Sequence, residues 1–283
     1  MQDVFIPCVS GAVSQIVRQN ARRWCAESVY TPYTGAIGVQ RQEQTISMSS
    51  ILNIETSTNI CSVSLSRDGL SEFSRRNDDG GKHGTLLGTY VDEALEYAQM
   101  HDIAVDAVCV SKGPGSYTGL RIGVSMAKGV CYGRNIPLLS VPTLEVMCVP
   151  LLLYKADIDL SALLCPMIDA RRMEVYSAIY DSALHEVRPI HADIVTAETY
   201  LPWLDKQPVY FFGNGSEKCK EVIHHPNAHF VSDIVPDAKY MFPLAEKRLR
   251  SGETEDVAYF TPFYLKDFVA KPARDLLHPG NNG

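Results

Sequence analysis

A glycine-rich stretch is the part of the sequence best suited to hold a small anion. It reads Ser111-Lys112-Gly113-Pro114-Gly115-Ser116-Tyr117-Thr118-Gly119-Leu120-Arg121 and separates a strand pattern from a helical one. Glycines let the backbone approach a ligand closely, and a helix N-terminus favours negative charge. The stretch is not a P-loop, because Leu120 stands where lysine is required, and Thr118 breaks the G-x-G-x-x-G pattern. It predicts either an anion site, built on Gly113, Gly115, Ser116 and Gly119, or a structural turn with Thr118 as helix cap.

Two further turns carry residues of the same chemical kind. Glu55, Thr56 and Ser57 follow the first strand pattern, and nucleotide-binding proteins use such turns for magnesium and phosphate. Gly213 and Gly215 follow a later strand pattern and complete the candidate phosphate site. The alternative remains open, because Ser, Thr and Gly also favour turns through local hydrogen bonds and backbone freedom.

Metal and hydrolase chemistry have no support in the sequence. None of the eight histidines forms an H-x-x-x-H or H-E-x-x-H pair that would put two imidazoles on one helical face. His225 and His229 have the first spacing, but they lie in a loop pattern that contains Pro226, so we expect no metal ligands. No G-x-S-x-G motif is present, and no His or Asp near Ser116 suggests an activated nucleophile. We therefore expect no catalytic residue of these classes.

Composition describes an ordinary globular chain. The 283 residues are 46% hydrophobic and 21% charged, which suffices for one large domain or two lobes. Eight cysteines without a C-x-x-C pair suggest buried thiols in a reducing cytoplasm. Apolar runs are too short to cross a membrane, and the formal charge of -7 disfavours a large autonomous RNA-binding face.

The chain divides into four parts. Residues 1–49 lack a clear apolar period and are expected to form a disordered extension, with an organellar targeting segment as the alternative. Residues 50–155 predict three strands, a helix over 86–98, a strand over 105–111, a helix ending near 132, a strand over 137–141 and a helix capped by Thr143. This order is typical of a ribonuclease-H-like lobe.

The second half repeats the theme more weakly. Residues 156–272 predict a second lobe with strands over 162–169, 174–180 and 209–213 and an amphipathic helix over 239–250, followed by a flexible tail over 273–283. A charged turn around Ala170-Arg171-Arg172 joins the first two of these strands. We interpret it as either a functional hinge or a salt-bridged hairpin. The hairpin is favoured because charged turns are common and exposed ion pairs contribute little.

Taken together, these stretches resemble the TsaB/YeaZ family of the actin-like ASKHA superfamily. The resemblance covers residues 50–271. It rests on the opening strand and turn, His83, residues 113–123, residues 141–144, residues 168–176, Gly213-Asn214-Gly215 and residues 262–265. Glu55 departs from the family pattern, which has Asp there, and this lowers the expectation of ATPase activity.

The resemblance implies an α/β, actin-like fold with two ribonuclease-H-like lobes of mixed sheets flanked by helices. It implies a non-catalytic accessory subunit that binds and activates the related protein TsaD, which attaches threonylcarbamoyl to an adenosine beside the tRNA anticodon. TsaD-type proteins bear a metal-binding His pair on the first long helix, where this chain has His83 alone. The implied protein is cytoplasmic and has no cofactor of its own, with ATP bound at the level of the complex.

The implied partners are TsaD in a heterodimer, TsaE, and a second copy of this chain when TsaD is absent, while tRNA binds only through the complex. The expected interface lies on the two helices of the first lobe, where small and apolar residues permit close helix approach. Its residues are Leu87, Tyr90, Val91, Ala94, Ile122, Met126 and Val130.

Three other functions remain as alternatives. A free-standing actin-like ATPase or kinase would require ordered Mg-ATP at Glu55, Thr56 and the glycine-rich loops. A metalloendopeptidase is opposed because no metal-ligand motif falls on a predicted helix. A structural interaction domain unrelated to tRNA is opposed only by the specificity of residues 113–123.

Overall fold

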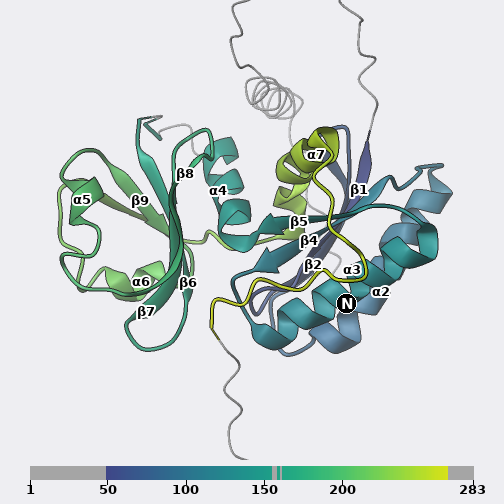
Figure 1. The fold of residues 1–283 in the computed structure, drawn as a ribbon, viewed down its shortest axis with the longest axis horizontal. Coiled ribbons are helices and arrows are strands. Elements are labelled where there is room, and N and C mark those ends of the chain that lie inside the picture. Colours follow the sequence, from purple (N-terminus) through teal and green to yellow (C-terminus); the bar gives the residue numbers. More distant parts are fainter. Residues whose placement is uncertain (1–48, 155–157, 160, 267–283) are drawn as a thin grey trace, which may run out of the picture.

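The computed structural model describes residues 49–154, 158–159 and 161–266, which form two lobes side by side (Figure 1). The expected tail over 273–283 and the expected extension, apart from Ser49, lie outside these ranges. Within them, no helix is both long and apolar enough to cross a membrane.

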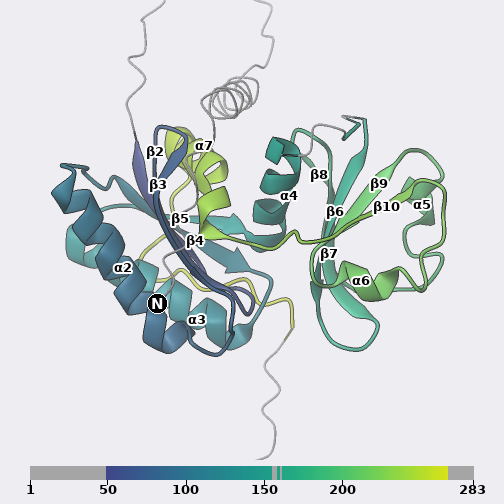
Figure 2. The ribbon, with the colours of Figure 1, turned by 180° about the vertical axis from the view of Figure 1, so that it is seen from behind.

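The first lobe is built on a five-stranded mixed sheet. Its strands are β1 (Ser50–Glu55), β2 (Cys61–Arg67), β3 (Leu70–Asn77), β4 (Ala107–Gly113) and β5 (Leu138–Pro142), in the spatial order β3-β2-β1-β4-β5. The first three strands pair antiparallel as a meander, and β4 and β5 add in parallel. Helices α2 (His83–Met100) and α3 (Tyr117–Arg134) cover the face that points away from the second lobe (Figure 2).

The second lobe repeats the same topology. Its strands are β6 (Leu163–Asp169), β7 (Glu174–Tyr180), β8 (Glu186–Ile194), β9 (Val209–Phe212) and β10 (Ala228–Val231), in the order β10-β9-β6-β7-β8. Read from the third strand of each lobe, both sheets have the order 3-2-1-4-5, with strand 2 antiparallel and strand 4 parallel to strand 1. The expected fold class, two ribonuclease-H-like lobes in an actin-like arrangement, is confirmed.

Several elements of the second lobe are absent from the sequence prediction. Strands β8 and β10 and the short helices α5 (Leu201–Leu204) and α6 (Ser216–Cys219) were not expected. Strand β8 is an edge strand whose residues are mostly exposed, so it shows no apolar alternation. The helices are single turns, too short to show a helical period.

Two helices lie between the sheets and join the lobes. Helix α4 (Thr143–Tyr154) buries residues on all sides, and α7 (Phe242–Ser251) follows the 3-10 turn η1 (Ala238–Tyr240). One hydrophobic cluster runs from the first sheet, through α4 and α7, into the second sheet. It includes Ile51, Leu139, Val141, Met147, Leu164, Ile168 and Leu244. The lobes therefore share a core.

The chain does not remain in the second lobe to its end. Helix α7 packs on β1 and β5, and residues 253–266, the C-terminal strap, run along the first lobe (Figure 1). Glu255 N–H donates to the carbonyl of Leu138, and Lys128 Nζ donates to the carbonyls of Ala258 and Phe260. The part of the expected second lobe beyond η1 thus belongs by packing to the first.

The observed helix ends differ from two of the sequence predictions. Helix α3 starts at Tyr117 with Ser116 as its cap, because Ser116 Oγ accepts from Gly119 N–H, so the expected cap at Thr118 is wrong. The helix expected over 239–250 is divided into η1 and α7, and α7 has proline in its first turn. Thr143 is the first residue of α4 and its hydroxyl pairs with Ser111 Oγ at 2.7 Å.

The cysteines agree with the sequence interpretation where the structure describes them. Cys61, Cys109, Cys131, Cys148, Cys165 and Cys219 are all free and buried. Burial raises the pKa of the Cys61 thiol to about 11. Cys8 and Cys25 lie outside the described residues.

Candidate functional site

The turn after β1 and the glycine-rich loop before α3 pack directly on each other. Ser116 N–H donates to the carbonyl of Ser57 at 2.6 Å, and Thr56 Oγ1 donates to the carbonyl of Gly119 at 2.8 Å. Glu55, Thr56 and Ser57 are fully buried. The structure therefore brings the predicted residues of the first lobe together, in contact with each other.

The chain's own backbone occupies the space beside the glycines of this loop. A Cβ at Gly115 would lie closer than 3.0 Å to the Ser57 carbonyl oxygen, and one at Gly119 equally close to that of Thr56. A Cβ at Gly123 would meet the Thr56 hydroxyl. The space that these glycines open is occupied by the turn, so they allow two backbone segments to pack rather than cradle a phosphate.

The other side of the loop is covered by the C-terminal strap. Phe263 N–H donates to the carbonyl of Lys112 at 2.7 Å, and a Cβ at Gly113 would lie 2.7 Å from the carbonyl oxygen of Phe263. Gly113 also has φ of +110°, a conformation suited to glycine. The ring centroids of Tyr117 and Tyr264 lie 4.7 Å apart, and this contact holds the strap in place.

Gly213 and Gly215 serve close packing in the second lobe. They lie between β9 and α6, and Gly213 has φ of +97°. A Cβ at Gly213 would clash with Met147 and with the Met167 carbonyl, and one at Gly215 with the backbone of Ile168. Their neighbours belong to α4 and β6 rather than to the glycine-rich loop of the first lobe.

Glu55 is the unusual polar group of this region. Its Oε1 accepts from Ser57 N–H at 2.6 Å, whereas its Oε2 and the Ser57 hydroxyl are buried with no hydrogen-bond partner in the described part of the chain. Burial raises the pKa of Glu55, and the hydrogen bond from Ser57 opposes that rise only in part. A carboxyl enclosed in this way, whose charged form is disfavoured by burial, is a poor ligand for Mg²⁺, which prefers a charged, hydrated site.

The raised pKa of Glu55 predicts a pH-dependent effect of Glu55→Gln. The folded protein holds the proton at pH values where the unfolded chain has lost it, so stability falls as pH rises above the ordinary glutamate range. Glutamine stays neutral, and its amide can donate to the unpartnered Ser57 hydroxyl. We expect the melting temperature of the variant to exceed that of the wild type by a few degrees at pH 8, and the difference to shrink towards pH 5. A lower melting temperature of the variant at pH 8 would contradict a raised pKa of Glu55.

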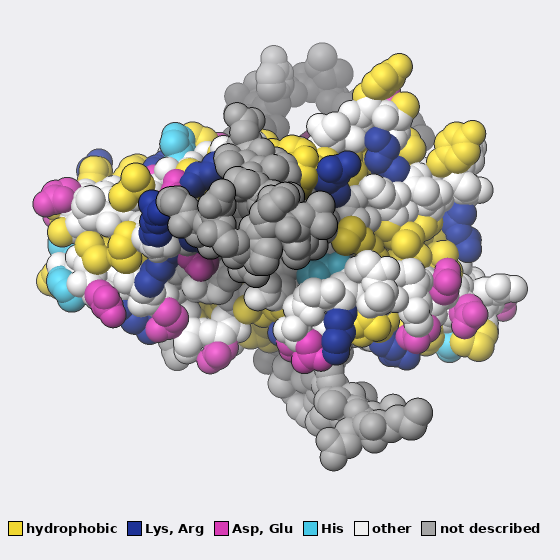
Figure 3. All heavy atoms as spheres, turned by 90° about the horizontal axis from the view of Figure 1, so that it is seen from below, with side chains coloured by type: hydrophobic (Ala, Val, Ile, Leu, Met, Phe, Trp, Pro, Cys, Tyr) yellow, Lys and Arg dark blue, Asp and Glu magenta, His cyan; other side chains and the backbone are white. Residues whose placement is uncertain are grey.

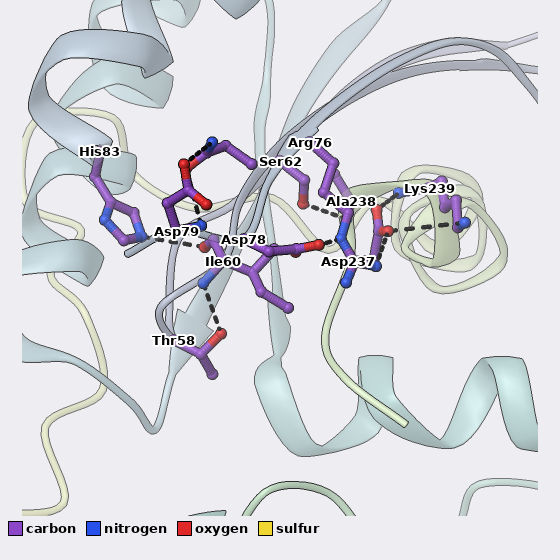
Figure 4. A network of polar contacts seen from close by, with 11 residues as sticks. Thr58, Ile60, Ser62, Arg76, Asp78, Asp79, His83, Asp237, Ala238 and Lys239 are labelled. Carbon is purple, nitrogen blue, oxygen red and sulfur yellow. Dashed lines mark hydrogen bonds and ion pairs between the residues drawn. The ribbon is translucent and has the colours of Figure 1, made fainter. Parts of the chain in front are cut away.

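His83 has a structural role at the start of α2. Its Nε2 lies 3.1 Å from the carbonyl oxygen of Ile60, and its side chain points at the β1–β2 connection (Figure 4). Among the described residues, no group of three His, Cys, Asp or Glu side chains is placed to hold a metal ion.

A polar network that the sequence did not predict joins the first sheet to η1. Arg76 of β3 pairs with the buried Asp237 at 3.0 Å, and Ser62 Oγ accepts from Ala238 N–H at 2.9 Å (Figure 4). Arg76 and Asp237 are 161 residues apart along the chain, and Ser62 and Ala238 are 176 apart, so only the fold brings them into contact. The network holds η1 and the residue before it against the first sheet.

The surface of α2 and α3 carries a shallow groove of about 850 Å³. Its lining is largely apolar and includes two exposed glycines one helical turn apart. The lining residues are Gly84, Leu95, Arg121, Ile122, Ser125, Met126, Gly129, Val130, Gly133 and Arg134. From below, hydrophobic side chains are seen to gather on the first-lobe half of the molecule (Figure 3).

The groove contains only part of the expected interface. Ile122, Met126 and Val130 line it, and Tyr90 lies half-buried beside it in the helix layer. The other three expected residues, Leu87, Val91 and Ala94, are at most 2% exposed and pack in the core beneath α2, so they are not surface residues. Sequence reasoning missed Gly129 and Gly133, whose G-x-x-x-G spacing places both on one helical face.

Comparison with known proteins agrees with this architecture. Residues 80–274 match the family model described as TsaD: tRNA N6-adenosine threonylcarbamoyltransferase. The chain is 30% identical to the tRNA threonylcarbamoyladenosine biosynthesis protein TsaB of Bacillus subtilis, over 61% of this chain and 74% of that protein. It is 28% identical to the protein of the same name from Escherichia coli, over 78% of this chain and 96% of that protein.

A solved structure supports the same assignment. YeaZ from Pseudomonas aeruginosa superposes with a TM-score of 0.65 at 25% identity, over 77% of this chain and all of that chain. The chain therefore belongs to the TsaB/YeaZ family, and with it to the wider group of proteins that the TsaD model describes.

Proposed function

We propose that this protein is a non-catalytic subunit of the cytoplasmic machinery that forms threonylcarbamoyladenosine in tRNA, and that it binds and activates a TsaD-type enzyme. The relatives from Bacillus subtilis and Escherichia coli are named for this biosynthesis, and the matching family model is named for the transferase. The observation that carries the proposal is the apolar groove on α2 and α3.

The groove suits a helical partner of similar fold. Ile122, Met126 and Val130 offer apolar surface, while Gly129 and Gly133 leave room for a second helix to approach closely. Arg121 and Arg134 stand at its polar rim, as is usual for a protein interface. The proposed occupant is the equivalent helix pair of the TsaD-type enzyme, and a second copy of this chain takes its place when that enzyme is absent.

The packing of the glycine-rich loop favours the accessory role over an ATPase. Thr56 and Ser57 fill the loop on one side and Phe263 covers Gly113 on the other. A nucleotide bound between these segments would have to displace main-chain hydrogen bonds. We therefore propose that the chain has no cofactor of its own and that ATP and TsaE act at the level of the complex.

The decisive experiment is reconstitution of tRNA threonylcarbamoylation with cognate TsaC, TsaD and TsaE, with ATP, threonine and bicarbonate. Modified adenosine is measured by mass spectrometry with and without this chain. We expect formation to depend on the chain. Equal formation in its absence would refute the accessory role, and ATP binding by the isolated protein would then be measured.

A further inference from the structure

The hairpin between β6 and β7 presents two arginines on a rigid turn. Ala170 N–H donates to the carbonyl of Glu174 at 3.0 Å, and Glu174 N–H donates back to the carbonyl of Arg171 at 3.1 Å. Arg171 N–H also donates to Asp169 Oδ1 at 3.0 Å. The turn is held from beneath by Lys218 of α6, whose Nζ donates to the carbonyls of Arg172 and Glu174 at 2.6 and 2.7 Å.

Both arginines adopt a backbone conformation that is unfavourable for residues with a Cβ. Arg171 has φ of +71° and Arg172 has φ of +49°, in the left-handed region. That conformation costs roughly 1–2 kcal/mol for a residue with a Cβ, whereas glycine adopts it freely and asparagine more readily than most. Two adjacent arginines are therefore not what the turn itself requires.

Neither arginine forms an ion pair with another described residue. The carboxylates on either side of them, Asp169 and Glu174, are paired with lysines from distant segments, Lys218 and Lys266. Both guanidinium groups belong to exposed residues, and the ion pairs and hydrogen bonds of the described chain include neither of them. Lysines neutralise the neighbouring acids, and this leaves the two guanidinium groups free for an external anion.

The surroundings of the turn favour a polyanion over an acidic protein surface. Protein interfaces usually have a buried apolar centre. None of the exposed large apolar side chains of the described residues lies between 169 and 176, and the exposed one that the strand register places beside the turn is Ile194, opposite Glu174 on β8. Phosphate contacts need only well-placed cations, and the planar guanidinium matches a phosphate with two parallel hydrogen bonds. Lys and Arg side chains lie on the second-lobe half of the lower face, with Asp and Glu side chains interspersed among them (Figure 3).

We propose that Arg171 and Arg172 form a contact surface for the phosphate backbone of RNA. This inference rests on the proposed function, in which the chain works in a complex that modifies tRNA. The formal charge of -7 makes strong binding by the isolated chain unexpected. The pair instead adds two phosphate contacts to an RNA that the partner enzyme also holds.

The test separates this role from the stability of the hairpin. In the variant Arg171→Asn with Arg172→Gly, residues that tolerate the left-handed backbone replace the two arginines. We expect an unchanged or higher melting temperature, unchanged assembly with the cognate TsaD, and weaker tRNA binding by the complex. Fluorescence anisotropy over a range of salt concentrations should show affinity reduced on the order of tenfold and a shallower dependence of log K on log salt, by about 2.

The matched control removes two charges elsewhere, through Arg67→Asn with Lys206→Asn. These residues lie at the β2–β3 turn and after α5. The proposal is overturned if the arginine variant binds tRNA with wild-type affinity and salt dependence, or if the control loses as much. It is also overturned if the arginine variant loses assembly with TsaD at equal melting temperature, which would identify a protein-docking surface.

Failure of the proposed function is a separate outcome. If this chain does not assemble with TsaD, the same variants are compared as isolated proteins with a single-stranded RNA oligonucleotide at low salt. A salt-dependent loss confined to the arginine variant would still support the phosphate contact, and equal binding by all three proteins would overturn it.

Discussion

Gly119→Ala is expected to destabilise the protein by about 3 kcal/mol or more, because overpacking against a rigid backbone cannot relax. The new Cβ would lie closer than 3.0 Å to the carbonyl oxygen of Thr56, a main-chain atom buried at the end of β1. Relief would require α3 to move away from β1 and would break the hydrogen bond from Thr56 Oγ1 to Gly119. Thermal and denaturant unfolding, followed by circular dichroism, measure the loss.

Gly129→Ala in the same helix is the matched control and has the opposite expected sign. Nothing lies within 4 Å of the Cβ that would be added there. Alanine in an exposed helical position gains roughly 0.5–1 kcal/mol over glycine. If Gly119→Ala proved as stable as Gly129→Ala, the close packing of the glycine-rich loop on the first turn would be wrong, and a ligand-binding role for the loop would regain support.

Gly129→Arg is expected to weaken assembly with the TsaD-type enzyme on the order of 100-fold, because a charge would be buried where two helices meet. The same residue is open to solvent in this chain, so the variant should fold with little change in melting temperature. Calorimetric titration with the cognate TsaD measures the affinity. Formation of modified adenosine in the reconstituted reaction should fall in parallel.

Tyr132→Arg is the control for that experiment. Tyr132 lies on the same helix, is 85% exposed and does not line the groove. It should bind the partner normally. If both variants bound TsaD like the wild type, the α2–α3 groove would not be the docking surface, and the accessory function would need another interface.

Local patterns predicted much of the first lobe correctly. The meander of β1, β2 and β3, helix α2 and the glycine-rich turn before α3 all follow from the alternation or helical period of neighbouring residues. The resemblance of residues 113–123, 168–176 and 213–215 to one family indicated the duplicated fold, which the equal strand orders of the two sheets confirm. The prediction failed for β8 because an exposed edge strand need not alternate.

The local sequence did not determine which apolar residues are buried and which lie on the surface. Helical spacing places Leu87 and Ile122 alike on apolar faces, but only the packing of α2 and α3 on the sheet makes the first a core residue and the second a surface residue. The same holds for the glycines. Their positions are evident from the sequence, whereas the segments that fill the space beside them, Thr56, Ser57 and Phe263, come from distant parts of the chain.

The sequence by itself thus determined the family, the order of most strands and helices and the residue types at each turn, because these depend on neighbours along the chain. Only the tertiary structure decided that the chain's own backbone closes the glycine-rich loop and that the C-terminal strap returns to the first lobe. It also decided that the guanidinium groups of Arg171 and Arg172 form no ion pair within the described part of the chain. Those properties depend on contacts between residues far apart in sequence, which no local pattern encodes.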